Sequence, residues 1–273
     1  HNFMKRLRHF CEELKPGFAL IGEVLFGDYN LIVNDEMLHS CTNYECYKGI
    51  YSSFNSMNMF EIAHSLNRQY GPEQWCIYRG KHLMTFVDNH DVSRLATILT
   101  NKNHIPLAYG LLFGMPGIPC IYYGSEWGEE GAKAPDNDYA LRPCFEEPKP
   151  NKLTAFIKAL IALRRESDAL CNGTYHNVVI TNHQLVFERR TESERVLVAI
   201  NASDAEYTAG SHELNGTFSR MLTYPGEFKT LVSKVALEEA ENFSDQEAAA
   251  ADTVTLNGQI TMPAYSVQYL KMC

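Results

Sequence analysis

The 273-residue sequence has no apolar run long enough to cross a membrane. Its longest apolar runs, at residues 108–113 and 118–123, fall well short of the roughly 18 residues that a membrane-spanning helix requires. An excess of positive charge is also missing, because the formal net charge is -9. A negatively charged chain is repelled by nucleic acid and by anionic membrane surfaces. We therefore expect neither a nucleic-acid partner nor a membrane partner.

Signatures of several kinds of chemistry are also absent. The sequence has no Gly-x-Ser-x-Gly elbow, no zinc-like Cys/His spacing and no calcium loop. The eight cysteines form no Cys-x-x-Cys pair, and Cys120 lies inside an apolar run. Scattered thiols are typical of a reduced cytosolic protein rather than of a disulfide framework, so we expect a cytoplasmic location. The chain begins with His1 rather than Met, and we expect its true N-terminus to be missing.

Short apolar runs alternate with helical patterns up to about residue 170. The apolar runs are found at residues 18–21, 83–87 and 118–123, and a further short strand is expected near 39–45. Helical periodicity is found at residues 3–14, about 54–70, 104–113 and 153–165. Buried strands that alternate with helices are typical of a parallel sheet covered on both faces. We therefore predict an α/β architecture for this part of the chain.

The pattern changes after Cys171. Short strand-like runs follow one another without helices between them, at residues 178–180, 184–187, 196–200, 253–256 and 266–270. They predict an antiparallel β-sandwich, and hence two domains, residues 1–171 and 172–273. The acidic, alanine-rich stretch at 238–252 interrupts the second domain and is expected to be a solvated loop or a short helix.

Acidic residues follow two of the predicted parallel strands. Glu23 comes after the first strand, and Asp88, His90 and Asp91 come after the second. In α/β enzymes the active site collects at the C-terminal ends of the strands. Glu23 could also be a solvated loop acid, and Asp91 could cap a helix, but capping leaves Asp88 and His90 unexplained. Paired carboxylates in this position suit glycoside hydrolysis, in which one acid protonates the leaving oxygen and another negative charge stabilises an oxocarbenium-like transition state.

Three segments resemble motifs of the α-amylase family. Residues 86–91, Phe-Val-Asp-Asn-His-Asp, resemble its seventh-strand motif, residues 22–24 its fifth-strand motif and residues 117–126 its eighth strand. They occur in the family's order and with similar separations. The resemblance implies that residues 1–171 are the second half of a (β/α)8 TIM barrel, and that the family's C-terminal β-sandwich follows.

The resemblance also implies roles for individual residues. Glu23 would be the general acid/base and Asp91 the transition-state stabiliser, and their carboxyl groups should converge on one cleft at about 5–10 Å. His90 would hydrogen-bond hydroxyl groups of the sugar, and Arg94 would orient the Asp91 loop within the substrate-binding site. Glu126, also at a strand end, is expected near the rim in a structural role. Four aromatic residues could stack on sugar rings, although at least half of them are expected to be packing residues: Tyr44, Tyr47, Tyr123 and Trp127.

The family's nucleophile is absent from the sequence. It is an aspartate in a fourth-strand motif similar to Gly-Phe-Arg-x-Asp, which would precede the first predicted helix and does not occur here. Without it the usual covalent intermediate cannot form, so the chain alone is expected to be inactive. A half barrel has open strand edges, so we expect either the missing N-terminal half, as another chain or fragment, or self-association. No cofactor is evident, and the resemblance leaves room for calcium in the missing half.

Three functions fit these observations. The leading hypothesis is part of a retaining hydrolase whose oligosaccharide substrates are α-1,4-glucans or maltodextrins. The second is a transglycosylase, branching enzyme or α-glucosidase of the same fold, because the choice of acceptor depends on loops that are largely missing. The third is a catalytically silent, amylase-like binding protein. The presence of both Glu23 and Asp91 argues against this third function.

Overall fold

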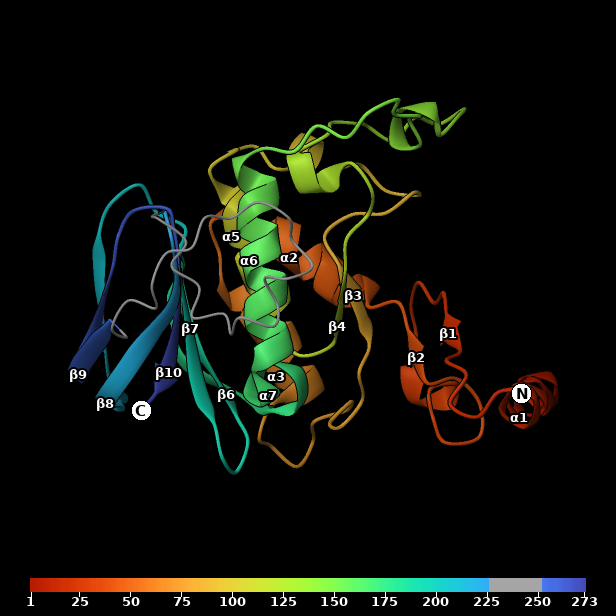
Figure 1. Cartoon of the computed structure of the whole chain (residues 1–273), viewed down its shortest axis with the longest axis horizontal. Coiled ribbons are helices and arrows are strands. Elements are labelled where there is room, and N and C mark those ends of the chain that lie inside the picture. Colours follow the sequence, from red (N-terminus) through yellow and green to blue (C-terminus); the bar gives the residue numbers. More distant parts are fainter. Residues whose placement is uncertain (226–251) are drawn as a thin grey trace, which may run out of the picture.

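The computed structural model of the chain describes residues 1–225 and 252–273. A set of short parallel strands, a layer of helices and an antiparallel sheet follow one another across the molecule (Figure 1). Apart from Asp252, the stretch 238–252 that was expected to be a loop or short helix lies outside the described residues. None of the helices in the described ranges combines the length and the apolar character needed to cross a bilayer.

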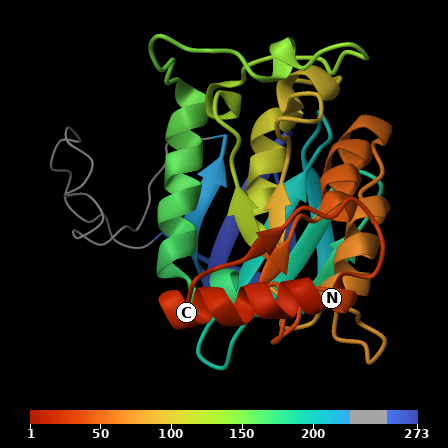
Figure 2. The ribbon, with the colours of Figure 1, turned by 90° about the vertical axis from the view of Figure 1, so that its right-hand side faces the viewer.

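The parallel strands are β1 (Ile21–Gly22), β2 (Ser40–Cys41), β3 (Met84–Phe86) and β4 (Ile118–Cys120). β1 pairs with β2, β3 pairs with β4, and a parallel bridge between Thr42 and Met84 connects the two pairs. The strands therefore lie in the order β1-β2-β3-β4 and end at the same edge, which is the upper edge in Figure 2. This arrangement confirms the predicted parallel strands with intervening helices.

Helices precede, separate and follow these strands. They are α1 (Asn2–Leu14), α2 (Tyr44–Ser56), α3 (Phe60–Tyr70), α4 (Leu95–Ile98), α5 (His104–Gly114), α6 (Lys152–Glu166) and α7 (Asp168–Asn172), with 3-10 turns η1 (Tyr29–Leu31), η2 (Ser125–Trp127) and η3 (Tyr139–Leu141). The single helix predicted at about 54–70 was wrong, because Met57 takes a left-handed conformation (φ 51) that ends α2 before α3 begins. The strand expected near 39–45 is shorter, because the Asn43 side chain caps α2 by accepting from the backbone N–H of Cys46.

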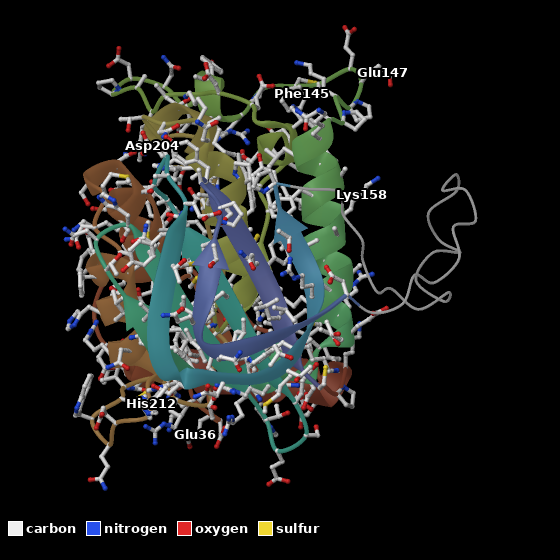
Figure 3. The ribbon with its side chains drawn as sticks, turned by 90° about the vertical axis from the view of Figure 1, so that its left-hand side faces the viewer. Glu36, Phe145, Glu147, Lys158, Asp204 and His212 are labelled. Carbon is white, nitrogen blue, oxygen red and sulfur yellow. The ribbon has the colours of Figure 1, made fainter. Side chains whose placement is uncertain are left out.

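The C-terminal part is one antiparallel sheet. Its strands are β5 (Thr174–Ile180), β6 (Gln184–Arg190), β7 (Arg195–Asn201), β8 (Tyr207–Tyr224), β9 (Thr253–Met262) and β10 (Ser266–Met272), in the order β5-β6-β7-β10-β8-β9. The sheet curls, as its open face shows in Figure 3. Alternate residues of β7 face two cores: Val198 packs with the helices, whereas Leu197 packs with Phe218 and Ile260 inside the curl. The predicted antiparallel β region is confirmed, and β8 was missed.

Two buried arginines bind the C-terminal end of α5, and one of them, Arg189, joins the helical layer to this sheet. Arg164 of α6 donates to the carbonyl oxygens of Phe113 (2.6 Å) and Met115 (3.1 Å), and Arg189 of β6 donates to that of Gly114 (2.8 Å). These carbonyls lie at the C-terminal end of α5, where the last turn of a helix leaves its acceptors unpaired. One hydrophobic core also contains residues from both parts of the chain. The domain limits at 171 and 172 stay a prediction.

Candidate active site

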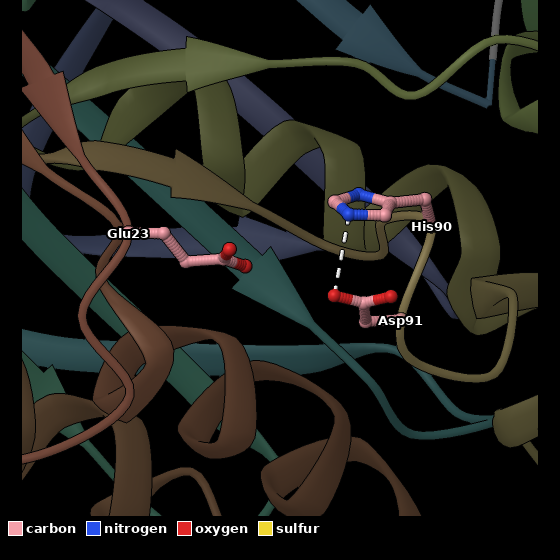
Figure 4. A group of neighbouring side chains, drawn as sticks. All are labelled: Glu23, His90 and Asp91. Atoms are coloured by element: carbon pink, nitrogen blue, oxygen red, sulfur yellow. Dashed lines mark ion pairs between the residues drawn. The ribbon is translucent and has the colours of Figure 1, made fainter.

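Glu23, His90 and Asp91 come together at the C-terminal edge of the parallel strands. One ligand atom from each lies within 4.8 Å of those of the other two, and His90 Nε2 lies 3.2 Å from Asp91 Oδ2. Figure 4 shows the Glu23 side chain, which follows β1, pointing toward the pair on the turn after β3. The two carboxyl groups therefore converge on one place, with an oxygen of each within 4.8 Å of the other. Their catalytic roles stay predictions.

A cavity of about 460 Å³ opens beside these acids, and we call it the cleft. Its volume lies in the range that small-molecule ligands occupy. Glu23 and His90 are exposed and Asp91 is half-buried, so a ligand can reach all three. The residues that line the cleft are Glu23, Leu25, Tyr44, Asp91, Val92 and Lys133.

Tyr44 connects the two acids through hydrogen bonds. Its hydroxyl donates to Glu23 Oε1 (3.0 Å) and accepts from Asn89 Nδ2 (2.9 Å). The Asn89 side-chain oxygen in turn accepts from the backbone N–H of Asp91 (2.9 Å). Burial raises the pKa of Tyr44, so its hydroxyl keeps the proton that it donates. The network fixes Glu23 relative to the Asp91 turn.

Two cationic residues that the sequence did not indicate hold the Asp91 turn. Arg142 Nη2 lies 2.9 Å from Asp91 Oδ1, and Arg142 Nε donates to the backbone oxygen of His90 (3.3 Å). Lys133 Nζ donates to the backbone oxygen of Asp91 (2.7 Å). Both residues belong to the irregular segment between β4 and α6, which runs over the ends of the strands (Figure 2). No local pattern marks them, because their partners lie more than forty residues earlier in the chain.

Arg94 lies beneath the turn and away from the cleft. It is fully buried and donates to the backbone oxygens of Tyr123 (2.6 Å) and Leu141 (2.8 Å), and its guanidinium group lies 4.1 Å from the ring centre of Tyr122. The structure does not bring Arg94 to the carboxylates of Glu23 and Asp91. Its contacts suit the predicted orienting role, and its part in substrate binding stays a prediction.

Asp88 is a second buried anchor of the same turn. Its Oδ2 atom accepts from the backbone N–H of Leu95 (2.7 Å) and from Ser125 Oγ (2.7 Å). Burial raises the pKa of Asp88, although both hydrogen bonds and the nearby Arg94 oppose the shift. Asp88 therefore ties the end of β3 to the start of α4 and to the segment after β4, and is too buried to contact a substrate.

The other predicted strand-end and aromatic residues lie outside the cleft. Glu126 does not line it, and its backbone oxygen accepts from Thr154 Oγ1 (2.9 Å). Tyr47 is buried and stacks on Phe86, with ring centres 5.3 Å apart. Tyr123 and Trp127 both pack edge-on against Phe145. Of the four stacking candidates, Tyr44 alone lines the cleft.

The only candidate metal ligands that the described residues bring together are the predicted catalytic acids and the histidine beside them. Within residues 1–225 and 252–273, Glu23, His90 and Asp91 are the one group of histidine, cysteine or acidic residues whose ligand atoms are close enough to share an ion. Arg142 already pairs with Asp91, so a cation would compete with a guanidinium group there. The arrangement suits proton transfer and charge stabilisation more directly.

Sequence comparisons identify relatives of the chain. Residues 1–149 match the model of the α-amylase catalytic domain. A cyclomaltodextrinase of Thermoanaerobacter pseudethanolicus is 27% identical over 232 residues, which cover 79% of this chain and 38% of the relative. An intracellular maltogenic amylase of Bacillus subtilis is 29% identical over 210 residues, which cover 72% and 34%. A cyclomaltodextrin glucanotransferase of Bacillus sp. (strain 1011) is 34% identical over 120 residues, which cover 43% and 16%.

Solved structures share the fold. An α-amylase of Geobacillus thermoleovorans in complex with acarbose superposes with a TM-score of 0.76 at 18% identity, over 100% of this chain and 57% of that one. A cyclomaltodextrinase gives a TM-score of 0.73 at 22% identity, over 100% and 43%. The chain thus spans 57% of the α-amylase and smaller shares, 34% to 43%, of the two cyclomaltodextrinases and the maltogenic amylase. The match to the catalytic-domain model covers residues 1–149, which are more than half of this chain, and the chain therefore belongs to the α-amylase family.

Proposed function

We propose that this chain supplies the acid/base and the transition-state stabiliser of a retaining glycoside hydrolase that acts on α-1,4-glucans or maltodextrins. The observation that carries the proposal is the convergence of Glu23, His90 and Asp91 within 4.8 Å at the edge of one cleft. Relatives named cyclomaltodextrinase and maltogenic amylase support this substrate class.

In this proposal Glu23 protonates the glycosidic oxygen as the leaving sugar departs, and later removes a proton from the incoming water. Asp91 places a fixed negative charge beside the oxocarbenium-like centre, and its preorganisation comes from Arg142 and from the Asn89 side chain. His90 lies beside Asp91, where its ring can hydrogen-bond a sugar hydroxyl. Tyr44 keeps the Glu23 carboxyl group facing the cleft.

We also propose that β1 to β4 are strands five to eight of an eight-stranded barrel, and that β5 to β10 form the family's C-terminal sandwich. The solved relatives are covered for only 43% to 57% of their length, which leaves a comparable part for the remaining strands. Helix α1 has no buried residue and exposes Phe3 (72%), Phe10 (58%) and Leu14 (70%). An exposed apolar surface of this kind supports a partner that packs against α1. We propose that this partner is the missing N-terminal half of the barrel, as another chain or fragment. A second copy of the chain is the alternative.

The fourth-strand nucleophile would come from that half, and the chain alone would then be inactive. Calcium, if the enzyme requires it, would bind there as well. The eight cysteines are free thiols, which supports the proposal of a cytoplasmic location.

The test combines the chain with the polypeptide that carries strands one to four and follows maltoheptaose by NMR. We expect hydrolysis with products released in the α configuration, and none with the chain alone. Products of the β configuration, or no turnover by the combined polypeptides, would contradict the proposal.

Glycosyl transfer is the second candidate, favoured by the 34% identity to a cyclomaltodextrin glucanotransferase. It keeps the same residues and differs in whether water or a sugar hydroxyl attacks the intermediate. Oligosaccharides longer than maltoheptaose among the products would favour transfer, whereas shorter products alone would favour hydrolysis.

A further inference from the structure

The sequence contains three Asn-Gly pairs, the dipeptide in which an asparagine side chain is most readily converted to a carboxylate. They are Asn172-Gly173, Asn215-Gly216 and Asn257-Gly258. Glycine has no side chain, so its backbone nitrogen can approach the Cγ atom of the preceding asparagine. The approach also requires a backbone that can rotate, because regular helices and strands keep the two atoms apart. The local structure therefore decides which pair reacts in the folded chain.

The first pair is held at the end of a helix. Asn172 is the last residue of α7, and its Nδ2 atom donates to Asp168 Oδ1 (2.7 Å). The backbone N–H of Gly173 donates to the carbonyl oxygen of Ala169 (2.9 Å). The nitrogen that would attack and the side chain that it would attack are both engaged in hydrogen bonds, so this pair is protected.

The second pair lies on β8 and is held by the sheet. Asn215 Nδ2 donates to the carbonyl oxygen of His212 (2.7 Å), which fixes the side chain. Gly216 is paired with Leu256 of β9 in the antiparallel ladder. The two strands must therefore open locally before this asparagine can react.

The third pair lies where the pairing of β8 with β9 is interrupted. Asn257 and Gln259 each have a partner on β8, whereas Gly258 between them has none, and its φ is left-handed at +78. The Asn257 side chain is exposed and makes no hydrogen bond to any described residue. β9 is also an edge strand of the sheet (Figure 1). The backbone around Asn257 is thus the least restrained of the three.

We propose that Asn257 is the residue at which the folded chain undergoes spontaneous deamidation, an inference that does not depend on the proposed function. The backbone nitrogen of Gly258 forms a bond to Cγ of Asn257. The bond from Cγ to Nδ2 breaks, and ammonia leaves with the proton that the Gly258 nitrogen gives up. Water from the solvent then opens the succinimide ring at either carbonyl group, which leaves aspartate or isoaspartate at this position.

The isoaspartate product adds a methylene group to the backbone of β9. Leu256 and Ile260 lie on either side of Asn257 and are both buried inside the curl of the sheet. Inward-facing residues of a strand must keep their register, so a longer backbone between these two moves one of them out of place. β9 pairs with β8 alone, and no other strand holds it in position. We therefore expect β9 to open more readily after the reaction.

The test incubates the 273-residue chain at mildly alkaline pH, with and without urea, and follows each Asn-Gly pair by peptide mapping with mass spectrometry. In the folded chain Asn257 should deamidate about tenfold faster than Asn172, and also faster than Asn215, because the other two pairs must first open locally. In urea the three rates should converge, since each asparagine is followed by glycine. Asn257→Gln should abolish the reaction at this position, because a glutamine side chain closes a ring far more slowly, and should leave the other two rates unchanged.

Hydrogen exchange of the aged chain tests the effect on β9. Residues 253–262 should exchange faster in aged wild type than in aged Asn257→Gln, and the control Asn172→Gln should age like the wild type. Equal rates for Asn257 and Asn172 in the folded chain, or a faster reaction at Asn215, would overturn Asn257 as the modification site. The same order of rates with and without urea would also overturn it, because the interrupted pairing would then have no influence. Unchanged exchange in a chain that carries isoaspartate would overturn the inferred effect on β9.

Discussion

The hydroxyl group of Tyr44 lies 3.0 Å from Oε1 of Glu23 and accepts a hydrogen bond from Asn89 at 2.9 Å. Tyr44 begins α2, whereas Glu23 follows β1 and Asn89 follows β3. Three separate elements therefore meet in one hydrogen-bonded chain that ends at the backbone of Asp91. The separation of the two predicted catalytic acids depends on this tyrosine as well as on the strands.

Tyr44→Phe is expected to lower kcat of the assembled enzyme by about 10- to 100-fold, because Glu23 loses its hydrogen bond and its preferred orientation. KM should change less, since the ring that lines the cleft remains. Steady-state kinetics on maltoheptaose measure both constants. Tyr139→Phe is the control, because Tyr139 is 85% exposed and lies outside the cleft. An unchanged kcat for Tyr44→Phe would show that the bond has no role in positioning Glu23.

Arg142→Gln should loosen the turn that carries His90 and Asp91. The guanidinium group contacts the Asp91 carboxylate and the His90 carbonyl, so we expect faster amide exchange over residues 89–93 and a kcat lowered by about tenfold or more. Hydrogen exchange by mass spectrometry tests the first effect on the chain alone. Arg165→Gln, on the exposed face of α6, should leave the exchange pattern unchanged. Equal exchange rates in Arg142→Gln and the wild type would show that Arg142 does not hold the turn that carries His90 and Asp91.

Arg189→Leu is expected to destabilise the chain by about 2–4 kcal/mol. The buried guanidinium group donates to the carbonyl oxygens of Gly114 (2.8 Å) and Gly173 (2.9 Å), and its loss leaves these acceptors unpaired in the interior. Urea denaturation followed by circular dichroism gives the free energy of unfolding. Arg190→Leu provides a matched control, because Arg190 is the next residue of β6 and its side chain is 53% exposed. A similar loss for both variants would show that the buried hydrogen bonds are not responsible.

The buried His104 predicts a loss of stability in mild acid. Burial lowers the pKa of His104, although its ring nitrogen lies 2.9 Å from the Ala202 carbonyl oxygen. The folded state therefore binds this proton less readily than the unfolded state, whose histidine pKa is about 6.5. The stabilising effect of the neutral ring is complete above that pH and decreases as the pH falls below it.

Free energies of unfolding measured between pH 7.5 and 5 test this expectation. His104→Gln should show a smaller decrease over that range than the wild type. His212→Gln removes an exposed histidine and should retain the wild-type pH dependence (Figure 3). Parallel curves for His104→Gln and the wild type would exclude His104 as the group that titrates.

The sequence predicted features that follow from local pattern. Continuous apolar runs located β1, β3 and β4, and the rule that active sites lie at strand ends selected Glu23, His90 and Asp91, which the structure brings together. β8 was missed because its small and polar residues give no strong apolar alternation. The break between α2 and α3 at Met57 could not be predicted, because methionine rarely adopts a left-handed backbone conformation and no sequence pattern indicates it.

The contacts that set the geometry of the site could not be predicted. Tyr44 lies twenty-one residues from Glu23, and Arg142 lies fifty-one residues from Asp91. Both contacts depend on how strands and loops are arranged in space, which periodicity does not report. Arg94 shows that nearness in sequence can also mislead. It lies three residues after Asp91 in the chain, yet it is buried beneath the turn and does not line the cleft.

The most direct test of the central claim compares Glu23→Gln, Asp91→Asn and the wild type in the assembled enzyme, with maltoheptaose as substrate. Each change removes one carboxylate and keeps its shape, and should lower kcat by about 100-fold or more. Glu130→Gln, a 69% exposed acid, is the control and should leave kcat unchanged. Wild-type turnover by either of the first two variants would contradict the claim that these two acids carry the reaction.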